Sequence, residues 1–525
     1  MPDGLPPTPP GYREIPDRLN IAGEVIDRIE ERGFLERTAF VWDGGEISYA
    51  DFRARVNRLA HGLATSGIER GMPVLVRMHN CIEFAETVYA LLKIGALPVL
   101  QNSLLGAEEV DYVLGHSDAK AAVTLGTLAE PVLRLSDKLS AGIVIARGEA
   151  TTAASEYEAL IAAAPEGEYP TADTSANEPA FFVYTSGTTG RPKGIVHAHR
   201  WVVALGDSNR YRLPPEEEDR AYATGEWSFI SALGHNVMFP IRNGVTGVIL
   251  EDRPSAENVL AAIQRFKVTL MYSVATVYRR ILAIDGVEND YDLSSLRGCN
   301  ATGEALEAAT WQEFKDRIGC DIWEHYGVSE MQMVLGQGPL QPVKPGSIGV
   351  PIPGTRVAVM DDDYNKLPPD EVGHFLIASD NPGFFLGYHK DPEKTAEVVH
   401  DGWYHTGDLA SRDADGYYYI AGRSDDCFKS RGIFISPYEI ENVLRQHPAV
   451  VEACIVPLKD AEIGNRIRAV CVVRDGETAG DALAEQIRQD VRSRIAPYKA
   501  PHVVEFVDAL PKSPVGKVLR RELVS

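Results

Sequence analysis

An alternation of apolar strand-like runs and amphipathic helical runs most constrains the fold of the first half of the chain. Three strand-then-helix pairs follow one another at 74–78 with 85–94, 96–100 with 108–114, and 121–125 with 129–139. Such units place parallel strands in one sheet through right-handed crossovers. The alternation returns over 246–282. The sequence therefore predicts an α/β fold with a large N-terminal domain of parallel βαβ sheets.

The segment before this alternation shows three simpler patterns. Residues 21–32 have helical spacing, 38–49 alternate around Asp43-Gly44-Gly45, and 51–63 form an amphipathic repeat. We expect a helix, a β-hairpin and a second helix in that order.

The texture changes from about residue 348. Short alternating runs at 356–360, 373–377 and 417–420 lie between glycine and proline turns, which indicates a β-rich subdomain of antiparallel strands. Behind the polar stretch 422–426, the last part of the chain has its own pattern, with helices at 437–446 and 482–495, strands at 450–457 and 467–474, and a polar tail. We expect an N-terminal domain over 1–424 and a small α+β domain over 425–525.

Charge and cysteine usage exclude several functional classes. Against 52 Lys and Arg stand 75 Asp and Glu, which gives a net charge of -23, so general nucleic-acid binding is not expected. The six cysteines are scattered and include no C-x-x-C pair. This usage is typical of proteins in a reducing cytosol, where disulfides are rare. The start has no signal-peptide pattern, and no apolar stretch approaches the length of a membrane span. We expect a cytoplasmic protein without membrane insertion.

A segment rich in glycine and hydroxyl groups follows the apolar run at 180–183. It reads Tyr184-Thr185-Ser186-Gly187-Thr188-Thr189-Gly190-Arg191-Pro192-Lys193-Gly194, and a helix is predicted behind it at 197–205. Backbone N–H groups, hydroxyls and one lysine in a single turn suit a polyphosphate. A Walker A loop needs Gly-Lys-Ser/Thr, which is not present. The segment is therefore a candidate phosphate loop of another kind.

His197 and His199 are not expected to bind a metal. Two residues that flank one position of a helix point to different faces, and no Cys, His or Asp cluster joins them in the sequence.

Six motifs in order give the chain its resemblance to the adenylate-forming superfamily of acyl-CoA synthetases, adenylation domains of peptide synthetases and luciferases. They are the segments 184–194, 302–305, 326–330, 403–408, 422–426 and 511–517. The resemblance covers essentially the whole chain and is nearest to benzoate-CoA, 2-aminobenzoate-CoA and medium-chain acyl-CoA ligases. It implies that the C-terminal domain is mobile.

The resemblance implies a role for each motif in binding ATP and Mg²⁺. The phosphates would lie on Thr185, Ser186, Gly187, Thr188, Thr189, Gly190 and Lys193. The adenosine would contact Gly303, Glu304, Ala305, Tyr326, Gly327, Asp408 and Arg423. Ser329 and Glu330 would face the α-phosphate and Mg²⁺, a cation that takes oxygen ligands. The family more often has threonine at the position of Ser329, and serine keeps the hydroxyl.

The implied reaction has two halves. A carboxylate attacks the α-phosphorus of ATP to give an acyl-adenylate, and the thiolate of coenzyme A then displaces AMP. Lys517 would place a charge beside the attacking carboxylate, and the small domain would rotate about Asp425 between the halves. Lys429, Arg431 and Gly432 would belong to the thioester step. Phe434 stands where acetyl-CoA synthetases carry a phosphate-binding arginine, so Arg431 is the candidate for that charge.

The acid pocket of the family corresponds partly to 226–236, where Trp227, Ser231 and His235 stand. Met331 and Met333 are candidates for its wall. Trp227, His235 and the two methionines are also compatible with plain core residues. Ser231 stands where benzoate-CoA ligases carry an aromatic ring. The lost ring leaves space, which favours an aromatic or alicyclic acid bulkier or more substituted than benzoate.

Three other functions remain open at this point. The chain is compatible with a medium-chain acyl-CoA synthetase, or with a stand-alone adenylation enzyme that loads a carrier protein, although no carrier domain follows Ser525. A non-catalytic nucleotide-binding module would be expected to lose Lys517 or the 185–193 loop, and neither is lost. The expected partners are a small carboxylic acid, ATP and coenzyme A, and a homodimer is left open.

Overall fold

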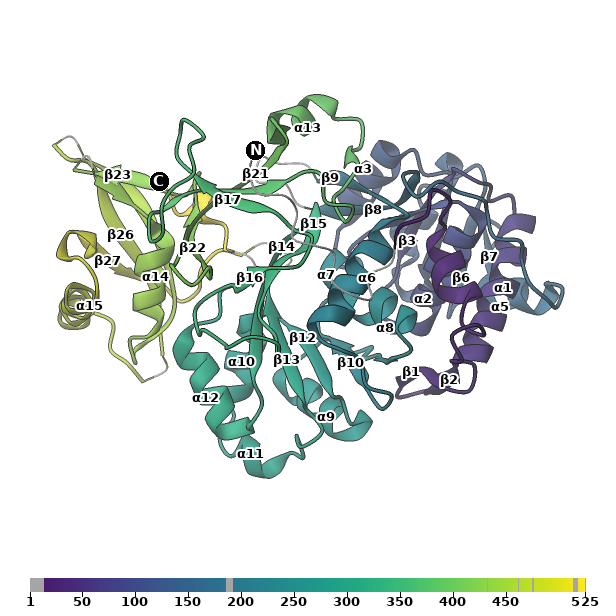
Figure 1. The fold of residues 1–525 in the computed structure, drawn as a ribbon, viewed down its shortest axis with the longest axis horizontal. Helices are drawn as coiled ribbons and strands as arrows, with labels where there is room; N and C mark the ends of the chain where they lie inside the picture. The colour runs from purple at the N-terminus through teal and green to yellow at the C-terminus, as the bar shows by residue number, and fades with distance from the viewer. Residues whose placement is uncertain are drawn as a thin grey trace. The chain divides into compact units, whose positions relative to one another are not determined.

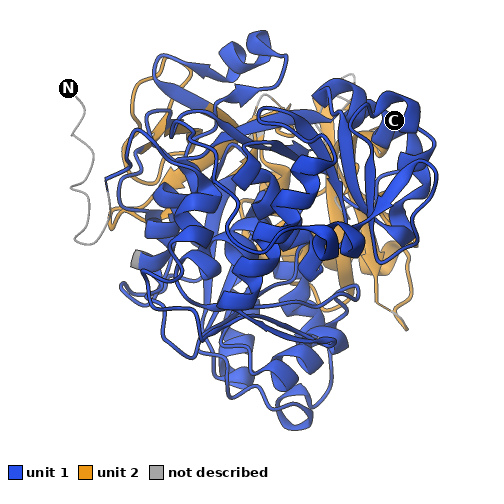
Figure 2. Cartoon of the chain, turned by 90° about the vertical axis from the view of Figure 1, so that its right-hand side faces the viewer, with its two compact units in different colours: residues 1–356, 378–404 blue, residues 357–377, 405–525 orange. Residues whose placement is uncertain are grey.

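The computed structural model describes residues 14–185, 192–431, 433–460, 462–474, 476–512 and 518–524, and Figure 1 shows its ribbon. The chain forms two compact units (Figure 2): unit 1 holds 1–356 and 378–404, and unit 2 holds 357–377 and 405–525. Among the described residues, no helix combines the length and the apolar character needed to cross a membrane. The predicted domain boundary at 424/425 stays a prediction, because the two compact units do not show which part of the chain moves.

Unit 1 contains an eight-stranded sheet whose central strands are parallel, as the strand-helix alternation predicts. The strand order is β19 (Gly387–Tyr388), β9 (Lys193–Ala198), β8 (Pro179–Thr185), β4 (Leu97–Leu100), β3 (Pro73–Arg77), β5 (Ala121–Leu125), β6 (Ile143–Ala146) and β7 (Ala154–Glu156). Only β9 is antiparallel to both of its neighbours, β8 and β19.

A second sheet of nine strands completes the β-structure of the unit 1 body. Its order is β16 (Val350–Pro351), β15 (Met331–Gly336), β14 (Ile322–Val328), β13 (Gly298–Thr302), β12 (Leu270–Ser273), β10 (Arg220–Ala223), β11 (Thr246–Val248), β1 (Thr38–Trp42) and β2 (Gly45–Ser48). The strands from β1 to β14 pair in parallel. The hairpins β1–β2 and β14–β15 flank them, and the first of these is the predicted hairpin at 38–49.

Helices separate and cover the two sheets, so unit 1 is built in alternating helical and sheet layers (Figure 1). The layer between the sheets contains α1 (Tyr49–Thr65), α2 (Ile82–Ile94), α5 (Tyr157–Ala163), α6 (Trp201–Arg212), α7 (Ile230–Ala232), the π-helical turn Leu233–Met238 and α8 (Phe239–Arg242). The outer layers contain α3 (Ala107–Ser117) and α4 (Glu130–Leu133) on one side, and α9 (Ala256–Phe266), α10 (Ala275–Leu282), α11 (Val287–Asp290) and α12 (Ala308–Ile318) on the other. The largest apolar cluster fills the middle layer.

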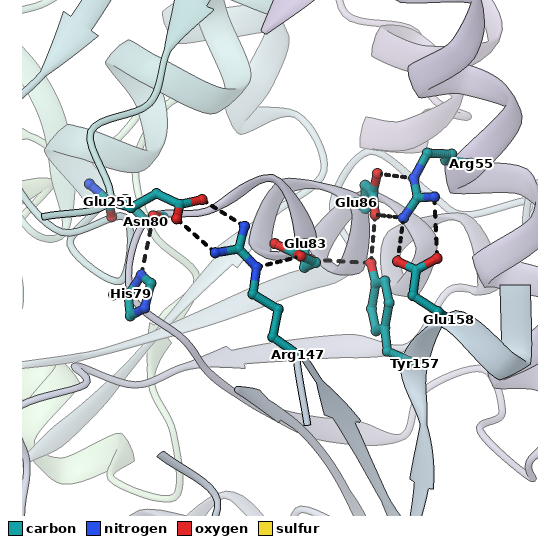
Figure 3. Close-up of polar contacts among 9 residues, drawn as sticks. All are labelled: Arg55, His79, Asn80, Glu83, Glu86, Arg147, Tyr157, Glu158 and Glu251. Carbon is teal, nitrogen blue, oxygen red and sulfur yellow. Dashed lines mark hydrogen bonds and ion pairs between the residues drawn. The ribbon is translucent and has the colours of Figure 1, made fainter. Parts of the chain in front are cut away.

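A polar network ties α2 to elements of both sheets (Figure 3). Arg147, directly after β6, forms ion pairs with Glu83 of α2 at 2.7 Å and with Glu251, behind β11, at 2.6 Å. Arg55 of α1 pairs with the fully buried Glu86 of α2 at 2.5 Å. Because a buried carboxylate must be paired to remain charged, these arginines fix where α2 can lie.

Unit 2 is an α+β assembly, as predicted for the C-terminal part. Its elements are β17 (Val357–Met360), β18 (Gly373–Ala378), β21 (Trp403–Arg412), β22 (Tyr418–Arg423), β23 (Phe428–Ser430), β24 (Ile433–Ile435), α14 (Pro437–Arg445), β25 (Val450–Asp460), β26 (Gly464–Val473), α15 (Asp481–Arg494) and β27 (Val503–Phe506), with the first residues of β21 and the last residue of β18 in unit 1. The hairpin β25–β26 packs against α14 and α15 around one apolar core. The short elements β20 (Val399–His400) and α13 (Pro392–Val398) belong to unit 1.

The predicted helix at 197–205 is wrong over its first part. Residues 193–198 form β9, antiparallel to β8, and α6 begins only at Trp201. Ile195 and Val196 are β-branched and fit a pleated surface, and pairing with β8 satisfies their backbone groups. The argument that placed His197 and His199 on a helix is therefore wrong as well. The candidate phosphate loop connects two antiparallel strands and is not a strand-to-helix turn.

Three shorter differences have local causes. The predicted helix at 21–32 contains the π-helical turn Gly23–Asp27 followed by turns, since glycine is a weak helix former. The predicted helix at 129–139 breaks into α4 and a 3₁₀ turn at Ser136–Lys138. Serine and aspartate compete there for backbone hydrogen bonds. The polar tail contains an unpredicted strand, β27, parallel to β26.

Candidate active site

Lys193, Glu330 and Tyr388 meet in unit 1 at the foot of the phosphate loop. The Lys193 Nζ donates to Glu330 Oε1 at 2.9 Å and to the Tyr388 hydroxyl at 2.8 Å. The Tyr388 hydroxyl donates to the same Glu330 oxygen at 2.5 Å, and Lys193 Nζ lies 4.2 Å from the Tyr388 ring centroid. Two of the six motifs, 184–194 and 326–330, are thereby joined by one ion pair.

Glu330 is buried but remains the charged partner of this group. Burial alone would raise the pKa of its carboxyl, yet the charge of Lys193 and the hydrogen bonds from Tyr388 and Lys193 outweigh that effect and lower it. Burial followed by the charge of Glu330 raises the pKa of the Tyr388 phenol, so this group stays protonated. The site thus holds a carboxylate, an ammonium and a phenol in fixed geometry.

A tight hairpin presents Ser329 and Glu330. Val328 pairs with Met331, so these two residues form the turn between β14 and β15. A side chain at Gly327 would place its Cβ 1.7 Å from the carbonyl oxygen of Gln332, which only glycine avoids. His197 Nε2 donates to the Ser329 carbonyl at 3.0 Å, so this buried histidine supports the turn.

The segment 303–305 follows β13 and is held from two sides. Gly303 has a φ of +82°, a conformation that favours glycine. Glu304 Oε2 accepts from the Thr276 backbone N–H at 3.0 Å. Next to Ala305, the Leu306 N–H donates to the buried Glu324 at 3.2 Å. Tyr326 lies on β14, the strand adjacent to β13, so the predicted adenine residues come from neighbouring strands.

The tip of the phosphate loop lies outside the described residues. Ser186, Gly187, Thr188, Thr189 and Gly190 are predicted phosphate ligands in that segment, and their assignment stays a prediction. The loop is closed at its base by the pairing of Thr185 with Lys193.

Within unit 2, Asp408, Arg423 and Asp425 form one charged chain. Asp408 on β21 pairs in register with Arg423 on β22, and Arg423 Nη1 donates to Asp408 Oδ1 at 3.3 Å. The same guanidinium donates through Nε to Asp425 Oδ1 at 3.3 Å. The predicted ribose residues and the predicted hinge residue are therefore linked by one arginine.

The predicted thioester residues lie at the hairpin β23–β24. Lys429 is on β23, and Arg431 follows with a φ of +53°, its N–H donating to the Ile463 carbonyl at 3.0 Å. Gly432 lies outside the described residues. The positive charges of Arg431 and Arg466 add to burial in lowering the pKa of His502, so basic groups gather at this end of unit 2.

Lys517 and its loop 513–517 also lie outside the described residues. Its two flanks, Lys512 and Val518, form an antiparallel bridge, and the Leu519 N–H donates to the Pro511 carbonyl at 2.8 Å. The loop is thus anchored at both ends.

Trp227 lies in the core rather than at an open surface. Its ring is fully buried and packs at 5.6 Å from the Phe84 ring and 6.2 Å from the Phe40 ring. The Asn80 side chain accepts from the backbone N–H of Trp227 at 2.8 Å and donates to the Gly225 carbonyl at 2.9 Å. Its role as an acid-binding residue stays a prediction, and the direct observation is a packing role.

Ser231 and His235 belong to one hydrogen-bonded turn. The Ser231 carbonyl accepts from His235 Nδ1 at 3.0 Å and from the Gln332 side-chain amide at 3.0 Å. The His235 ring stacks on Tyr272 with centroids 4.3 Å apart. Burial, with Arg212 adding to it, lowers the pKa of His235 to about 3, so this imidazole is neutral. Met331 and Met333 are buried on β15 beside this turn.

Sequence reasoning missed several residues of the site. Tyr388 lies on β19, nearly 200 positions after its partner Lys193, and no motif that we used contains it. Arg212, His325 and Gln332 lie on α6, β14 and β15, and only their burial marks them.

Comparisons with known proteins agree with this architecture. The family model described as "AMP-binding enzyme" matches residues 28–389, and "AMP-binding enzyme C-terminal domain" matches 439–517. The benzoate-CoA ligase of Thauera aromatica is 33% identical over 523 residues, which covers 99% of this chain and 98% of that protein. The 4-hydroxybenzoate-CoA/benzoate-CoA ligase of Rhodopseudomonas palustris is 30% identical and covers 95% and 93%.

Solved structures give the same result. The anthranilate CoA ligase AuaEII in complex with anthranoyl-AMP has a TM-score of 0.89 and 30% identity, covering 97% of each chain. The two-sheet body, the ordered motifs and the smaller C-terminal part define an adenylate-forming enzyme, which confirms the predicted superfamily and fold class. The chain belongs to the AMP-binding enzyme family.

Proposed function

We propose that this chain is an ATP-dependent acid-CoA ligase that activates an aromatic or alicyclic carboxylic acid. The observation that carries the proposal is the Lys193–Glu330–Tyr388 group. This group joins the loop expected to bind the phosphates of ATP to the motif expected to face the α-phosphate and Mg²⁺. Full-length relatives whose names specify benzoate and hydroxybenzoates support the aromatic acid.

The chemistry needs positioning and charge, not a protein nucleophile. A carboxylate oxygen bonds to the α-phosphorus, pyrophosphate leaves, and the acyl-adenylate remains bound. The thiolate of coenzyme A then attacks the carbonyl carbon, and the bond to the AMP oxygen breaks. Lys193 and Lys517 would stabilise the developing negative charge on phosphate oxygens.

Glu330 suits the Mg²⁺ that such a reaction uses. Its carboxyl is ionised, buried and held rigidly by hydrogen bonds at Oε1, which leaves Oε2 as the oxygen that we assign to the cation. A carboxylate oxygen is the ligand that Mg²⁺ prefers. When bound, the cation would neutralise phosphate charge.

Arg431 and its basic neighbours are the proposed contact for the phosphates of coenzyme A. Its backbone conformation is fixed by the bond to Ile463, and Arg466 and His502 add positive or titratable groups nearby. The free thiols, among them Cys320, which donates to the Cys299 sulfur at 3.9 Å without a disulfide, support a reducing cytosol as the protein's location.

A panel of acids with ATP, Mg²⁺ and coenzyme A tests the proposal. Benzoate, cyclohexanecarboxylate, octanoate and acetate are compared by AMP release and by the mass of the acyl-CoA formed. The proposal expects ring acids to have the highest kcat/KM. Preference for octanoate would favour the medium-chain alternative, and AMP release without acyl-CoA would favour loading of a carrier protein.

A further inference from the structure

A buried group of polar side chains lies in unit 1, between the nine-stranded sheet and the helical layer that carries Ser231. We call it the acid-end cluster, and its members are Arg212, His235, Asn300, His325 and Gln332. Each of them exposes 6% or less of its surface. None of them contacts the Lys193–Glu330–Tyr388 group in the contacts described, so the cluster is a separate feature of the fold.

The members form a continuous chain of contacts. The Arg212 guanidinium touches both ring nitrogens of His325 and donates to Asn300 Oδ1 at 3.4 Å. The His325 ring centroid lies 6.4 Å from that of His235. The Gln332 amide nitrogen reaches His235 Nδ1 at 3.1 Å.

Three polar atoms of this cluster are buried without a hydrogen-bond partner among the described residues. They are Asn300 Nδ2, His235 Nε2 and Gln332 Oε1. Buried polar atoms are nearly always paired, because an unmade hydrogen bond costs free energy. A cluster with three such atoms is expected where a ligand supplies the missing partners.

The unpaired atoms of the cluster favour a ligand group that both donates and accepts hydrogen bonds. Burial and then the charge of Arg212 lower the pKa of both His235 and His325, so both rings are neutral. The guanidinium and the Asn300 amide are donors. Of the three unpaired atoms, Asn300 Nδ2 donates, whereas Gln332 Oε1 and the unprotonated His235 Nε2 accept. A hydroxyl, which both donates and accepts, therefore fits better than a methyl group.

The position of the cluster places it at the end of the acid away from the reaction. Gln332 lies on β15, two residues after Glu330 of the turn, roughly 7 Å at the rise of a strand. A Cβ at Gly234 would lie 2.4 Å from the Gln332 amide, so this glycine lets the amide reach Ser231. The same turn thus connects the predicted acid pocket to the cluster.

We propose that the acid-end cluster binds a hydroxyl substituent on the ring of the acid substrate. This inference rests on the proposed acid-CoA ligase function. It names a narrower substrate class, in which the acid is recognised at both ends.

The first test uses the wild-type enzyme. Hydroxybenzoates are compared with the methylbenzoates of the same ring position, by AMP release with ATP, Mg²⁺ and coenzyme A. We expect at least one hydroxybenzoate to exceed its methyl counterpart about 10-fold or more in kcat/KM. Methylbenzoates that equal or exceed their counterparts at all three positions would overturn the inference. If none of the acids gives AMP, the proposed function itself fails.

Substitutions then locate the effect. Arg212→Met and Asn300→Leu should reduce the preference for hydroxyl over methyl about 10-fold, with KM for ATP unchanged. Arg265→Met is the matched control, because this arginine lies exposed on α9 and pairs with Asp43. If Arg212→Met does not fold, Asn300→Leu alone decides. An unchanged preference in a folded variant would contradict the inference.

Discussion

The two ends of the β14–β15 hairpin differ in how their charges are satisfied. At the turn, Lys193, Glu330 and Tyr388 share three short hydrogen bonds, two of which end on one carboxylate oxygen. Further along β14 and β15 lies the acid-end cluster, in which Arg212 contacts the neutral His325 ring and the Asn300 amide. Three polar atoms of this cluster have no partner among the described residues.

The difference fits the two ligands that the hairpin would face. ATP is the same in every enzyme of this kind, so a preorganised set of paired charges serves all of them. The acid differs between enzymes, and a buried polar group without a protein partner discriminates strongly between acids that can and cannot supply one. The comparison predicts that substitutions at one end leave the kinetics of the other ligand unchanged.

Lys517→Ala should give the largest effect on the ATP side. Loss of one preorganised charge costs about two to three decades in rate, so adenylation should fall by that much or more. Thioester formation from supplied acyl-adenylate should persist, as single-turnover measurements can establish. Equal loss in both half-reactions would mean that Lys517 acts structurally.

Glu330→Gln should come next. Removing the charge that pairs with Lys193 is expected to lower kcat/KM for ATP on the order of 100-fold, without changing the ranking of acids. Tyr388→Phe is the matched control. It keeps the ion pair and loses both hydrogen bonds of the phenol, worth about 1 kcal/mol each, so a loss of up to about 30-fold is expected. A changed acid ranking in Glu330→Gln would break the separation of the two ends.

Ser231→Tyr should act on the acid side alone. Refilling the space excludes bulky acids and improves the relative kcat/KM for benzoate, by roughly 10–200-fold for a single pocket change. KM for ATP is the control. An unchanged acid profile would place Ser231 outside the pocket and remove the reason to favour acids larger than benzoate.

Glu324 should affect stability rather than catalysis, with no effect on the kinetics of either ligand. Burial raises the pKa of this β14 carboxyl to about 8, against the hydrogen bond from Leu306. Between about pH 4.5 and 8 the folded state holds a proton that the unfolded state has lost, so stability falls as pH rises. Its contribution is at most about 1.4 kcal/mol per pH unit. Urea unfolding of Glu324→Gln between pH 5 and 8 should show a weaker decline than wild type. Parallel curves would show that Glu324 titrates normally.

Local patterns were sufficient to predict much of the fold. The strand-helix pairs from 74 to 125 gave β3, α2, β4, α3 and β5 at nearly their observed bounds, because hydrophobic periodicity reports burial directly. The strand β9 was missed because its structure depends on pairing with β8, a contact that no local pattern records. Tyr388 and Arg212 were missed for the same reason, since each contacts a polar partner more than 100 positions away in the sequence.

Transfer of an ¹⁸O label tests the central claim most directly. If a carboxylate oxygen of the acid attacks the α-phosphorus and the later C–O cleavage leaves that oxygen on phosphorus, acid labelled with ¹⁸O in its carboxylate must pass one label to AMP. The measurement is the mass of AMP released with ATP, Mg²⁺, coenzyme A and the preferred acid. We predict AMP that carries one label derived from the acid, together with acyl-CoA. Acyl-CoA formed with unlabelled AMP, or with ADP and phosphate as products, would contradict the account.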